Sequence, residues 1–405
     1  RYIAEGRLEE AYQVSASTNA FPEVCGRVCP QDRLCEGNCV VEQAGFGAIT
    51  IGNLEKYLTE IAWEKGWVKN LSSQNQYKQK VAIIGSGPAG MAASAYLIQN
   101  GYKVDVYEKN DRAGGLMIYG IPNFKLDKKI VERRTEWLTD SGVVFNLNTE
   151  VGKNISFQDL EKDYDAILIA TGVYKARQLD IDTSTVNNSI PALDFLIESN
   201  RTGLGDSPSK NKYLTAKDKH VVVIGGGDTA MDCVRTAIRQ QAKEVTCLYR
   251  RNKENMPGSA REVLNAEQEG IKFNWLSVPS KIISDSATAT SMTYKVATLG
   301  EVDESGRRKP IDTGVEKQIK SDLIIQALGF EPEDLNHNFK TNIELTSWKT
   351  VKVDFKKFQT SNPKIFAAGD IVRGASLVVW AIHDGREVAK SIHNFLQSSK
   401  IKKAS

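Results

Sequence analysis

The 405-residue sequence has neither a long apolar run nor a strong excess of charge of one sign. No stretch approaches the ~18 consecutive apolar residues of a membrane-spanning helix, and the opening residues RYIAEGRLEEAY are charged where a signal peptide is apolar. The 53 lysines and arginines are balanced by 50 aspartates and glutamates, without a long basic run. These absences predict a cytoplasmic protein that binds neither nucleic acid nor a membrane.

The sequence is long enough for two or three domains of about 150 residues, and its 41% hydrophobic content can fill sizeable cores. It opens on Arg1 within an apolar pattern that is typical of an amphipathic helix. This pattern consists of Ile3, Leu8, Ala11 and Tyr12. We therefore expect the natural N-terminus to lie upstream of Arg1.

Cysteine is scarce, but four of the six cysteines lie in the segment CGRVCPQDRLCEGNC, as Cys25, Cys29, Cys35 and Cys39. A reducing compartment and a chain of this size argue against a disulfide framework. The C-x3-C-x5-C-x3-C spacing matches neither a zinc finger or ribbon nor the C-x2-C-x2-C run of bacterial ferredoxins. From the spacing alone, zinc and an iron–sulfur cluster both stay open.

The segment after the cysteines, GNLEKYLTEIAWEKGW, has the apolar periodicity of a helix with one buried face. Its apolar positions are Leu54, Tyr57, Leu58, Ile61 and Ala62. Residues 68–79 are polar and lack such a pattern, which is typical of a linker. We therefore predict a small helical module over residues 1–67, followed by a separate domain.

The segment KVAIIGSGPAGMAASAYLIQNGYKVDVYEK predicts a complete dinucleotide-binding βαβ unit. Gly85 permits the tight turn, Gly87 lets the backbone approach a pyrophosphate, and Gly90 lets the helix pack closely on the strand. Glu108 ends the second strand, where a carboxylate can accept hydrogen bonds from ribose hydroxyls. The whole pattern is more specific than the glycines alone.

A second βαβ unit is predicted in KHVVVIGGGDTAMDCVRTAIRQQAKEVTCLYRR, where Gly225, Gly227 and Ala230 fill the three fingerprint positions. Its second strand ends at Arg250 and Arg251 instead of an acid. A carboxylate would repel the 2′-phosphate of NADP, whereas a guanidinium binds it with two hydrogen bonds. We therefore predict NADPH as the coenzyme, the alternative being two solvated arginines on a loop.

Cys233 and Cys247 fall on the helix and second strand of this second unit. Small buried thiols are ordinary packing residues at such places. Neither cysteine belongs to a C-x-x-C pair, which argues against a thioredoxin-reductase-like dithiol beside the nicotinamide. We predict no chemistry for either of them.

Two further segments favour a flavin in the first unit. YDAILIATG is a buried strand that runs into Thr171–Gly172, and KIFAAGDIVRGASLVVWAIHDG is a strand followed by Gly369 and Asp370. The helix expected next has Ser376 and Leu377 in its first turn, and its N-terminus can stabilise negative charge on a reduced flavin. Asp370 can hold ribityl hydroxyls, although by itself it is equally well an ordinary turn or capping residue.

The predicted fold class is α/β, with two nested Rossmann-like dinucleotide-binding domains of the FAD/NAD(P)-linked reductase type preceded by a helical module that carries the cysteines, which the family resemblance given next implies to be an iron–sulfur module. The predicted ranges are 1–67 for the module, truncated at its N-terminus, 79–200 with 340–405 for the FAD domain, and 205–335 for the NADPH domain. The FAD domain is thus interrupted by the NADPH domain.

Taken together, these motifs resemble the small (beta) subunits of bacterial NADPH-dependent glutamate synthases along almost the whole chain. The segments that carry the resemblance are CGRVCPQDRLCEGNCV, AIIGSGPAG, YGIPNFKL, IATGVYKAR, VVVIGGGDTAMDCVRTA, YRRNKENMPGSAREV, ALGFEPEDL and FAAGDIVRGASLVVWAIHDGRE. The resemblance implies an enzyme that oxidises NADPH through FAD and 4Fe-4S clusters. Its partner would be a large (alpha) subunit that carries FMN and makes L-glutamate from 2-oxoglutarate and glutamine during ammonia assimilation.

The resemblance also implies a role for the cysteine segment. In relatives with two interleaved clusters, one cluster is held by three cysteines and a Glu or Gln from a following helix. Carried onto this sequence, Cys29, Cys35 and Glu55 would serve the cluster nearer FAD, Cys39 would serve the second, and Cys25 would bind nothing. The remaining ligands would lie upstream of Arg1. Without the resemblance, Glu55 reads as a solvated residue in the first turn of a helix.

Hydride transfer needs binding and orientation more than an acid or base, so we predict binding residues and no catalytic side chain. The candidate cofactor-binding residues are Gly85, Gly87, Pro88, Ala89, Gly90, Glu108, Gly115, Leu116, Thr171, Gly172, Gly225, Gly227, Asp228, Thr229, Ala230, Arg250, Arg251, Gly369, Asp370, Ser376 and Leu377. The candidate metal ligands are Cys29, Cys35, Cys39 and Glu55.

Two other functions stay open. The flavin subunit of a ferredoxin:NADP transhydrogenase or sulfide dehydrogenase shares these modules, although ASLVVWAIHDGRE and RLCEGNCVVEQ favour glutamate synthase. A non-catalytic assembly module, with zinc on its cysteines, belongs to a different class of protein. The two intact nucleotide fingerprints argue against it.

Overall fold

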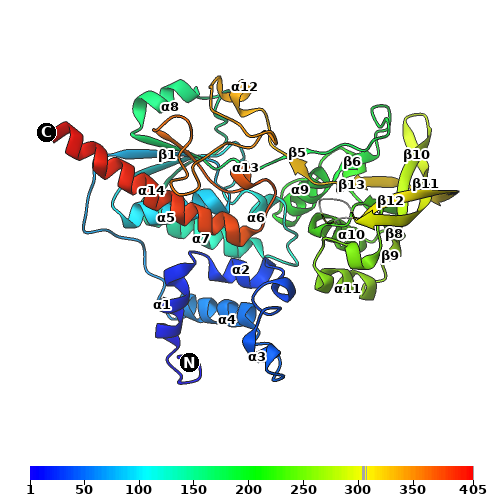
Figure 1. Cartoon of the computed structure of the whole chain (residues 1–405), viewed down its shortest axis with the longest axis horizontal. Helices are drawn as coiled ribbons and strands as arrows, with labels where there is room; N and C mark the ends of the chain where they lie inside the picture. Colours follow the sequence, from blue (N-terminus) through cyan, green and yellow to red (C-terminus); the bar gives the residue numbers. More distant parts are fainter. Residues whose placement is uncertain (303–305, 307, 405) are drawn as a thin grey trace. The chain divides into compact units, whose positions relative to one another are not determined.

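The chain folds into two compact units, which the computed structural model describes over residues 1–302, 306 and 308–404 (Figure 1). Unit 1 contains Arg1–Ile118, Phe124–Lys175 and Phe330–Ser405, and unit 2 contains Tyr119–Asn123 and Ala176–Gly329. The short strands β5 (Lys175–Ala176) and β14 (Phe330–Glu331) lie where the chain passes from one unit to the other. Unit 2 starts at Ala176, earlier than residue 205 of the predicted range, because β6 (Ser189–Pro191) belongs to its sheet.

The N-terminal part of unit 1 is helical, as the sequence predicts. Its elements are α1 (Leu8–Thr18), α2 (Pro22–Val28), the 3-10 turn η1 (Gln31–Arg33), α3 (Val40–Gln43) and α4 (Ile51–Glu64). Helices α2 and α4 pack closely because Gly26 faces Gly52; a Cβ on Gly26 would lie 2.4 Å from the Gly52 carbonyl oxygen. Leu58 and Ala62 are buried on α4. The predicted apolar face was wrong at Tyr57, which is 51% exposed, because the buried stripe runs through the side that meets α2.

The remainder of unit 1 is built on a five-stranded parallel sheet with the order β15-β4-β1-β2-β3. The strands are β1 (Lys80–Ile84), β2 (Lys103–Tyr107), β3 (Val144–Asn146), β4 (Ala166–Ile169) and β15 (Ile365–Ala367). The helices are α5 (Pro88–Gln99), α6 (Leu116–Tyr119), α7 (Lys128–Asp140), α8 (Phe157–Asp163), α12 (Leu335–Phe339), α13 (Asp370–Arg373) and α14 (Val378–Ala404). The strand β15 follows the whole of unit 2 in the sequence, so the sheet of unit 1 is formed by segments from both sides of unit 2.

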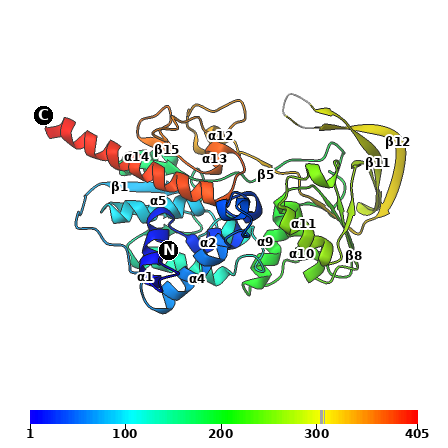
Figure 2. The ribbon, with the colours of Figure 1, turned by 60° about the horizontal axis from the view of Figure 1, so that its bottom comes forward.

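Helix α14 runs alongside α5 (Figures 1 and 2). The two backbones approach closely at Gly385, where a Cβ would lie 2.3 Å from the carbonyl oxygen of Ala89. Although α14 is long, no helix in the described part of the chain is both long and apolar enough to cross a membrane.

Unit 2 contains a second five-stranded parallel sheet, with the order β6-β13-β7-β8-β9. Its further strands are β7 (His220–Ile224), β8 (Glu244–Leu248), β9 (Lys272–Asn274) and β13 (Leu323–Gln326). Its helices are α9 (Ala192–Gly203), η2 (Lys212–Leu214), α10 (Asp228–Arg239), η3 (Lys253–Asn255) and α11 (Ala260–Gln268). Cys233 and Cys247 are fully buried in its core, as the sequence predicts.

A three-stranded antiparallel sheet is inserted between β9 and β13 of unit 2. It consists of β10 (Ser277–Asp285), β11 (Thr288–Val302) and β12 (Arg308–Lys320). The sequence analysis did not predict this sheet. The two parallel sheets with their helices, preceded by the N-terminal helices, confirm the predicted fold class.

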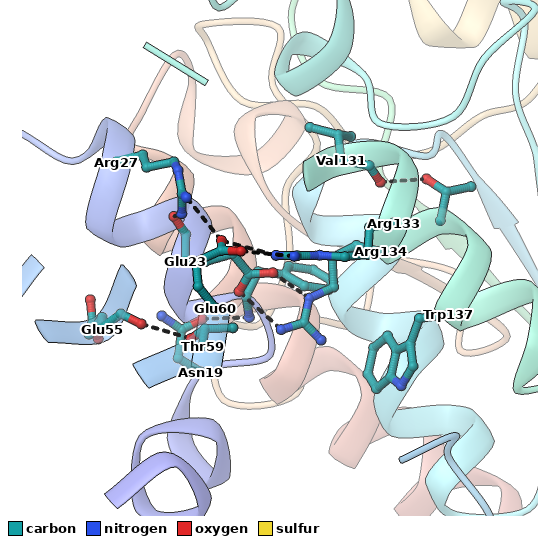
Figure 3. Close-up of polar contacts among 12 residues, drawn as sticks. Asn19, Glu23, Arg27, Glu55, Thr59, Glu60, Val131, Arg133, Arg134 and Trp137 are labelled. Atoms are coloured by element: carbon teal, nitrogen blue, oxygen red, sulfur yellow. Dashed lines mark hydrogen bonds and ion pairs between the residues drawn. The ribbon is translucent and has the colours of Figure 1, made fainter. Parts of the chain in front are cut away.

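The N-terminal helices are fixed to the rest of unit 1 by a buried ion pair between α2 and α7 (Figure 3). Arg134 Nε lies 2.6 Å from Glu23 Oε1, and Arg134 Nη2 lies 3.0 Å from Glu23 Oε2. The rings of Trp63 and Trp137 flank the guanidinium at 5.1 and 4.9 Å. The two parallel hydrogen bonds compensate the cost of removing both charges from water. A buried ion pair with such geometry can hold α2 and α7 together.

A second, more exposed bridge lies beside it (Figure 3). The Glu60 carboxylate of α4 accepts hydrogen bonds from Arg27 of α2 and from Arg133 of α7, at 2.9 Å each. Partial burial acts to raise the pKa of Glu60, but the hydrogen bonds and charges of Arg133 and Arg27 together outweigh it, so the pKa is lowered. The same carboxylate thus links two helices of the N-terminal module to the nucleotide fold.

We expect Arg134→Met to destabilise unit 1 strongly, because it leaves the Glu23 carboxylate buried without a cation. Breaking a buried pair from one side costs about 3–5 kcal/mol in the free energy of unfolding. Urea denaturation monitored by tryptophan fluorescence will measure the loss. Lys253→Met is the control, since it breaks an exposed pair with Glu267 and should cost less than about 1 kcal/mol. Equal losses for the two variants would contradict the role of Arg134.

Candidate cofactor sites

The candidate flavin residues of unit 1 come from four loops at one edge of its sheet. Gly85 follows β1, Glu108 follows β2, Thr171 follows β4, and Gly369 follows β15. Because the four strands are parallel and adjacent, their carboxyl ends meet at the same edge. Residues separated by almost 300 positions in the sequence are thereby brought to one place.

Glycines leave the backbone open at this edge. Gly85 has φ +101°, and a Cβ there would lie 2.5 Å from the Ala170 carbonyl oxygen. At Gly87 a Cβ would meet none of the described atoms within 4 Å, and at Gly115 it would lie 2.8 Å from the Gly87 Cα. The open face at Gly87 suits a pyrophosphate at the N-terminus of α5.

Three further predicted residues belong to the same turn and to α5. Pro88 begins α5, Ala89 is buried, and a Cβ on Gly90 would lie 2.1 Å from the Gly85 carbonyl oxygen. Gly90 therefore has the close-packing position that the fingerprint predicts for it. Leu116 begins α6 and is half-buried.

Glu108 is held by hydrogen bonds within the chain. It is 5% exposed, and its Oε2 accepts from the Ser86 amide at 3.1 Å and from the Ser86 hydroxyl at 2.6 Å. Its Oε1 accepts from the amide and side chain of Asn110. The sequence analysis missed both partners, although Ser86 lies within the glycine motif and Asn110 two residues after the acid. The carboxylate is thus pre-oriented at the end of β2.

Thr171 has a buried hydroxyl, and Oγ1 has no hydrogen-bond partner among the described residues. Its neighbour Gly172 adopts φ +70° and faces the ring of Tyr174. A buried hydroxyl normally finds a partner, because leaving it unpaired costs free energy. The orphaned hydroxyl and the open glycine turn both fit a bound nucleotide at this edge.

Asp370 also lies at this edge, where burial raises its pKa even though Ser376 donates a hydrogen bond to it at 2.6 Å. The predicted helix start was wrong here. A short helix, α13, begins at Asp370 and ends at Gly374, which has φ +77°, and α14 starts only at Val378. Ser376 and Leu377 therefore precede α14 instead of lying in its first turn.

Unit 2 repeats this arrangement with different side chains. Gly225 has φ +146°, and a Cβ there would lie 2.2 Å from the Ala327 carbonyl oxygen; at Gly227 a Cβ would meet none of the described atoms within 4 Å. Asp228 and Thr229 begin α10, and Ala230 is buried against the sheet. The Asp228 carboxylate accepts a hydrogen bond from the Ser259 amide at 2.8 Å.

The two arginines predicted to read the coenzyme follow β8. Arg250 is exposed, whereas Arg251 is half-buried and donates a hydrogen bond from Nε to the Arg308 carbonyl at 2.8 Å. Arg308 begins β12, so the inserted sheet orients Arg251. The sequence analysis missed this contact, because it joins residues 57 positions apart.

The candidate metal ligands of unit 1 lie around α2 and α4. The thiols of Cys25 and Cys29 interact, which raises the pKa of Cys25 and lowers that of Cys29. Burial raises the pKa of Glu55 to about 7, and the nearby Glu23 carboxylate adds to the shift. The charge of Glu55 also acts on Cys35. Glu55 is therefore a half-buried carboxylate whose charge acts on Cys25, Cys29 and Cys35, not a solvated one.

Cys39 stands apart from this group, and its sulfur accepts a hydrogen bond from the Ile49 amide at 3.5 Å. In the described chain, no three His, Cys, Asp or Glu side chains are close enough to hold one metal ion. A tetrahedral zinc site needs four donors at a single ion. Donors to a 4Fe-4S cluster each bind a different iron, so Cys29, Cys35 and Glu55 need not converge on one ion to serve a cluster.

Comparisons with known families agree with this reading. Residues 79–385 match the pyridine nucleotide-disulphide oxidoreductase family, and residues 1–67 match the 4Fe-4S domain II of dihydropyrimidine dehydrogenase. The fold resembles that of FprA from Mycobacterium tuberculosis in complex with NADPH, with a TM-score of 0.66, 19% identity, and 81% of this chain and 86% of that one covered. It also resembles thioredoxin reductase from Lactococcus lactis, with a TM-score of 0.59, 23% identity, and 79% and 100% covered. Fold and family together define an oxidoreductase with a 4Fe-4S domain.

More specific matches come from curated relatives. The chain is 52% identical over 402 residues to the glutamate synthase (NADPH) small chain of Azospirillum brasilense, covering 98% of this chain and 83% of that protein. It is 46% identical to the glutamate synthase (NADPH) small chain of Escherichia coli K12, covering 97% and 84%. The chain therefore belongs to the family of glutamate synthase (NADPH) small chains, and the resemblance inferred from the motifs is confirmed.

Thr171→Val tests whether the orphaned hydroxyl serves a bound flavin. Because the hydroxyl has no hydrogen-bond partner among the residues that the structure describes, its loss should leave the stability of the flavin-free protein unchanged or slightly higher. The affinity for FAD should fall about two- to tenfold, which corresponds to one hydrogen bond of about 0.5–1.5 kcal/mol. Calorimetric titration of flavin-free protein with FAD will measure this. Thr171→Ser keeps the hydroxyl and is the control; equal affinity of the Val variant and wild type would contradict the assignment.

Proposed function

We propose that this chain oxidises NADPH and delivers the electrons to a large FMN-containing subunit that makes L-glutamate from 2-oxoglutarate and glutamine. One observation carries the proposal: the helices with the candidate cluster ligands are fixed by the buried Glu23–Arg134 pair to the unit that has the candidate flavin edge. When bound, FAD accepts a hydride from NADPH, and 4Fe-4S clusters carry single electrons onward. The match to small chains, which covers 98% and 97% of this chain, supports this reading.

The residues of unit 1 would act as binders. The open backbone at Gly87, after the tight turn at Gly85, would admit the pyrophosphate, and Glu108, fixed by Ser86, would accept hydrogen bonds from the ribose. The hydroxyl of Thr171 would find its missing partner in the ligand. Asp370 would hold ribityl hydroxyls. None of these residues needs to transfer a proton for hydride transfer to occur.

The residues of unit 2 would bind NADPH by the same backbone geometry. Gly225 and Gly227 would bring the backbone to the pyrophosphate, and Arg250 and Arg251 would bind the 2′-phosphate. The carboxylate of Asp228, at the N-terminus of α10, is already engaged by the Ser259 amide. This leaves the arginines as the groups that distinguish NADPH from NADH.

The partner and the location belong to the proposal. The name small chain implies a complex with a larger chain in the relatives, and we propose the same for this chain, in the cytoplasm. The test is copurification with the large subunit, followed by NADPH-dependent glutamate formation and bleaching of flavin and iron–sulfur absorption. Bleaching by NADPH without glutamate formation would instead favour the flavin subunit of a transhydrogenase or sulfide dehydrogenase.

Replacing both Arg250 and Arg251 by Ala should lower the preference for NADPH over NADH at least about tenfold. Each guanidinium hydrogen bond to a phosphate contributes about 1.5–3 kcal/mol, whereas NADH has no 2′-phosphate to lose. NAD(P)H-driven reduction of an artificial dye gives the ratio of the two kcat/KM values. Lys253→Ala, a nearby basic residue paired with Glu267, is the control. An unchanged ratio in the double variant would rule out the assignment.

Glu55→Ala should destabilise one iron–sulfur cluster or shift its potential, while NADPH still reduces FAD. Ligand charge sets cluster potentials, and Glu55 is the half-buried carboxylate whose charge acts on Cys35. Iron and sulfide content and electron paramagnetic resonance of the reduced full-length protein will measure the effect. Glu64→Ala, near the exposed end of the same helix, is the control. If Glu55→Ala matches wild type in every measurement, the ligand must be sought elsewhere.

A further inference from the structure

A buried tyrosine precedes the loop of residues 250–255, which carries both predicted coenzyme arginines. Tyr249 directly follows β8, and only 5% of it is exposed. Its ring packs against the glycine turn of unit 2, since a Cβ on Gly226 would lie 2.4 Å from Cε2 of Tyr249. The ring of Trp275 meets it edge-on, with the ring centroids 6.4 Å apart. Packing therefore confines the ring of Tyr249 and fixes the direction of its hydroxyl.

The hydroxyl of Tyr249 is bonded to the far end of this loop. It donates a hydrogen bond to the carbonyl oxygen of Asn255 at 2.9 Å. Asn255 ends the 3-10 turn η3, and carbonyls at the end of a helical turn have no donor within the turn. The bond closes a short loop that contains Arg250 and Arg251. The Asn252 side chain tightens the same loop, because its Oδ1 accepts from Nδ2 of Asn255 at 2.6 Å.

The chain that leaves this loop is attached to the glycine turn as well. The amide of Gly258 donates a hydrogen bond to the carbonyl of Gly226 at 2.9 Å. The next amide, that of Ser259, donates to the carboxylate of Asp228 at 2.8 Å. The segment after β8 thus contacts the glycine turn before and after the arginines, and the tyrosine hydroxyl adds a tether between these two contacts.

We propose that Tyr249 is a positioning residue that strengthens the preference for NADPH by holding Arg250 and Arg251 in place for the 2′-phosphate. The inference rests on the proposed function. A loop and its long side chains lose conformational freedom when they bind a phosphate, and a loop that is ordered beforehand lowers this cost. The gain is confined to NADPH, because NADH has no 2′-phosphate for the arginines to bind.

Tyr249→Phe tests the proposal in the flavin-loaded, full-length protein, because it keeps the ring against Gly226 and removes only the hydroxyl. Asn252→Ala is a second variant, which loosens the same loop from a more exposed position. Tyr213→Phe is the matched control, since the hydroxyl that it removes shares a hydrogen bond with the Thr288 hydroxyl at 3.4 Å, elsewhere in unit 2. Thermal unfolding establishes that each variant is folded.

The readout is calorimetric titration with two ligands, adenosine 2′,5′-bisphosphate, which carries the 2′-phosphate, and adenosine 5′-monophosphate, which lacks it. We expect the ratio of the two affinities to fall about two- to tenfold in Tyr249→Phe, as for the loss of one hydrogen bond. Asn252→Ala should lower the ratio as well, and Tyr213→Phe should keep the wild-type ratio. A merely structural role of the hydroxyl would lower both affinities alike or neither.

A double-mutant cycle tests whether the effect passes through the arginines. In a protein that already carries Arg250→Ala and Arg251→Ala, Tyr249→Phe should change the ratio no further, because the groups that it positions are gone. An undiminished effect in this background would overturn the inference and leave the proposed function standing. So would a wild-type ratio in Tyr249→Phe or, if that variant does not fold, in Asn252→Ala. A wild-type protein that binds both ligands equally would overturn the proposed NADPH site together with the inference.

Discussion

The architecture of unit 1 depends on the buried pair between Glu23 and Arg134. The residues belong to helices 111 positions apart in the sequence, and both side chains are almost completely withdrawn from water. Each charge would be costly to bury alone, so the module and the nucleotide fold have a strong electrostatic reason to stay in one relative position. Apolar contacts alone are not directional, so they would not fix the N-terminal module in one position on the nucleotide fold. The same pair helps to keep α1 and α2 in place beside α14, where Arg386 donates a hydrogen bond to the Thr18 carbonyl.

Much of the nucleotide architecture could be predicted from the sequence, because it rests on local patterns. The strand, the glycine turn and the small-residue helix around Gly85–Gly90 predict a tight turn and close packing of the helix on that turn. The structure has both features. The parallel sheet then follows from repeating that unit. The interruption of one sheet by another domain was also predictable, because a strand and an acidic turn at Asp370 come after the second fingerprint.

What could not be predicted depends on contacts between distant residues. The partner of Arg134, the orphaned hydroxyl of Thr171 and the contact of Arg251 with β12 arise only when remote segments meet. The strands β10–β12 carry mixed polar and apolar residues without strict alternation, so periodicity gave no signal for them. The helix expected to have Ser376 and Leu377 in its first turn begins only at Val378, and the short helix α13 before Gly374, which has positive φ, was not predicted.

The two cysteines in the core of unit 2 have a consequence for the durability of the protein. Burial raises the pKa of Cys247 to about 12 and also raises that of Cys233. Peroxide attacks the thiolate, so thiols that remain protonated and out of contact with solvent are poor targets for sulfenic acid formation. Cys233 and Cys247 are therefore expected to resist oxidation while the protein is folded. The other four cysteines lie in the N-terminal module, where bound iron would shield the sulfurs of the candidate ligands Cys29, Cys35 and Cys39 from peroxide.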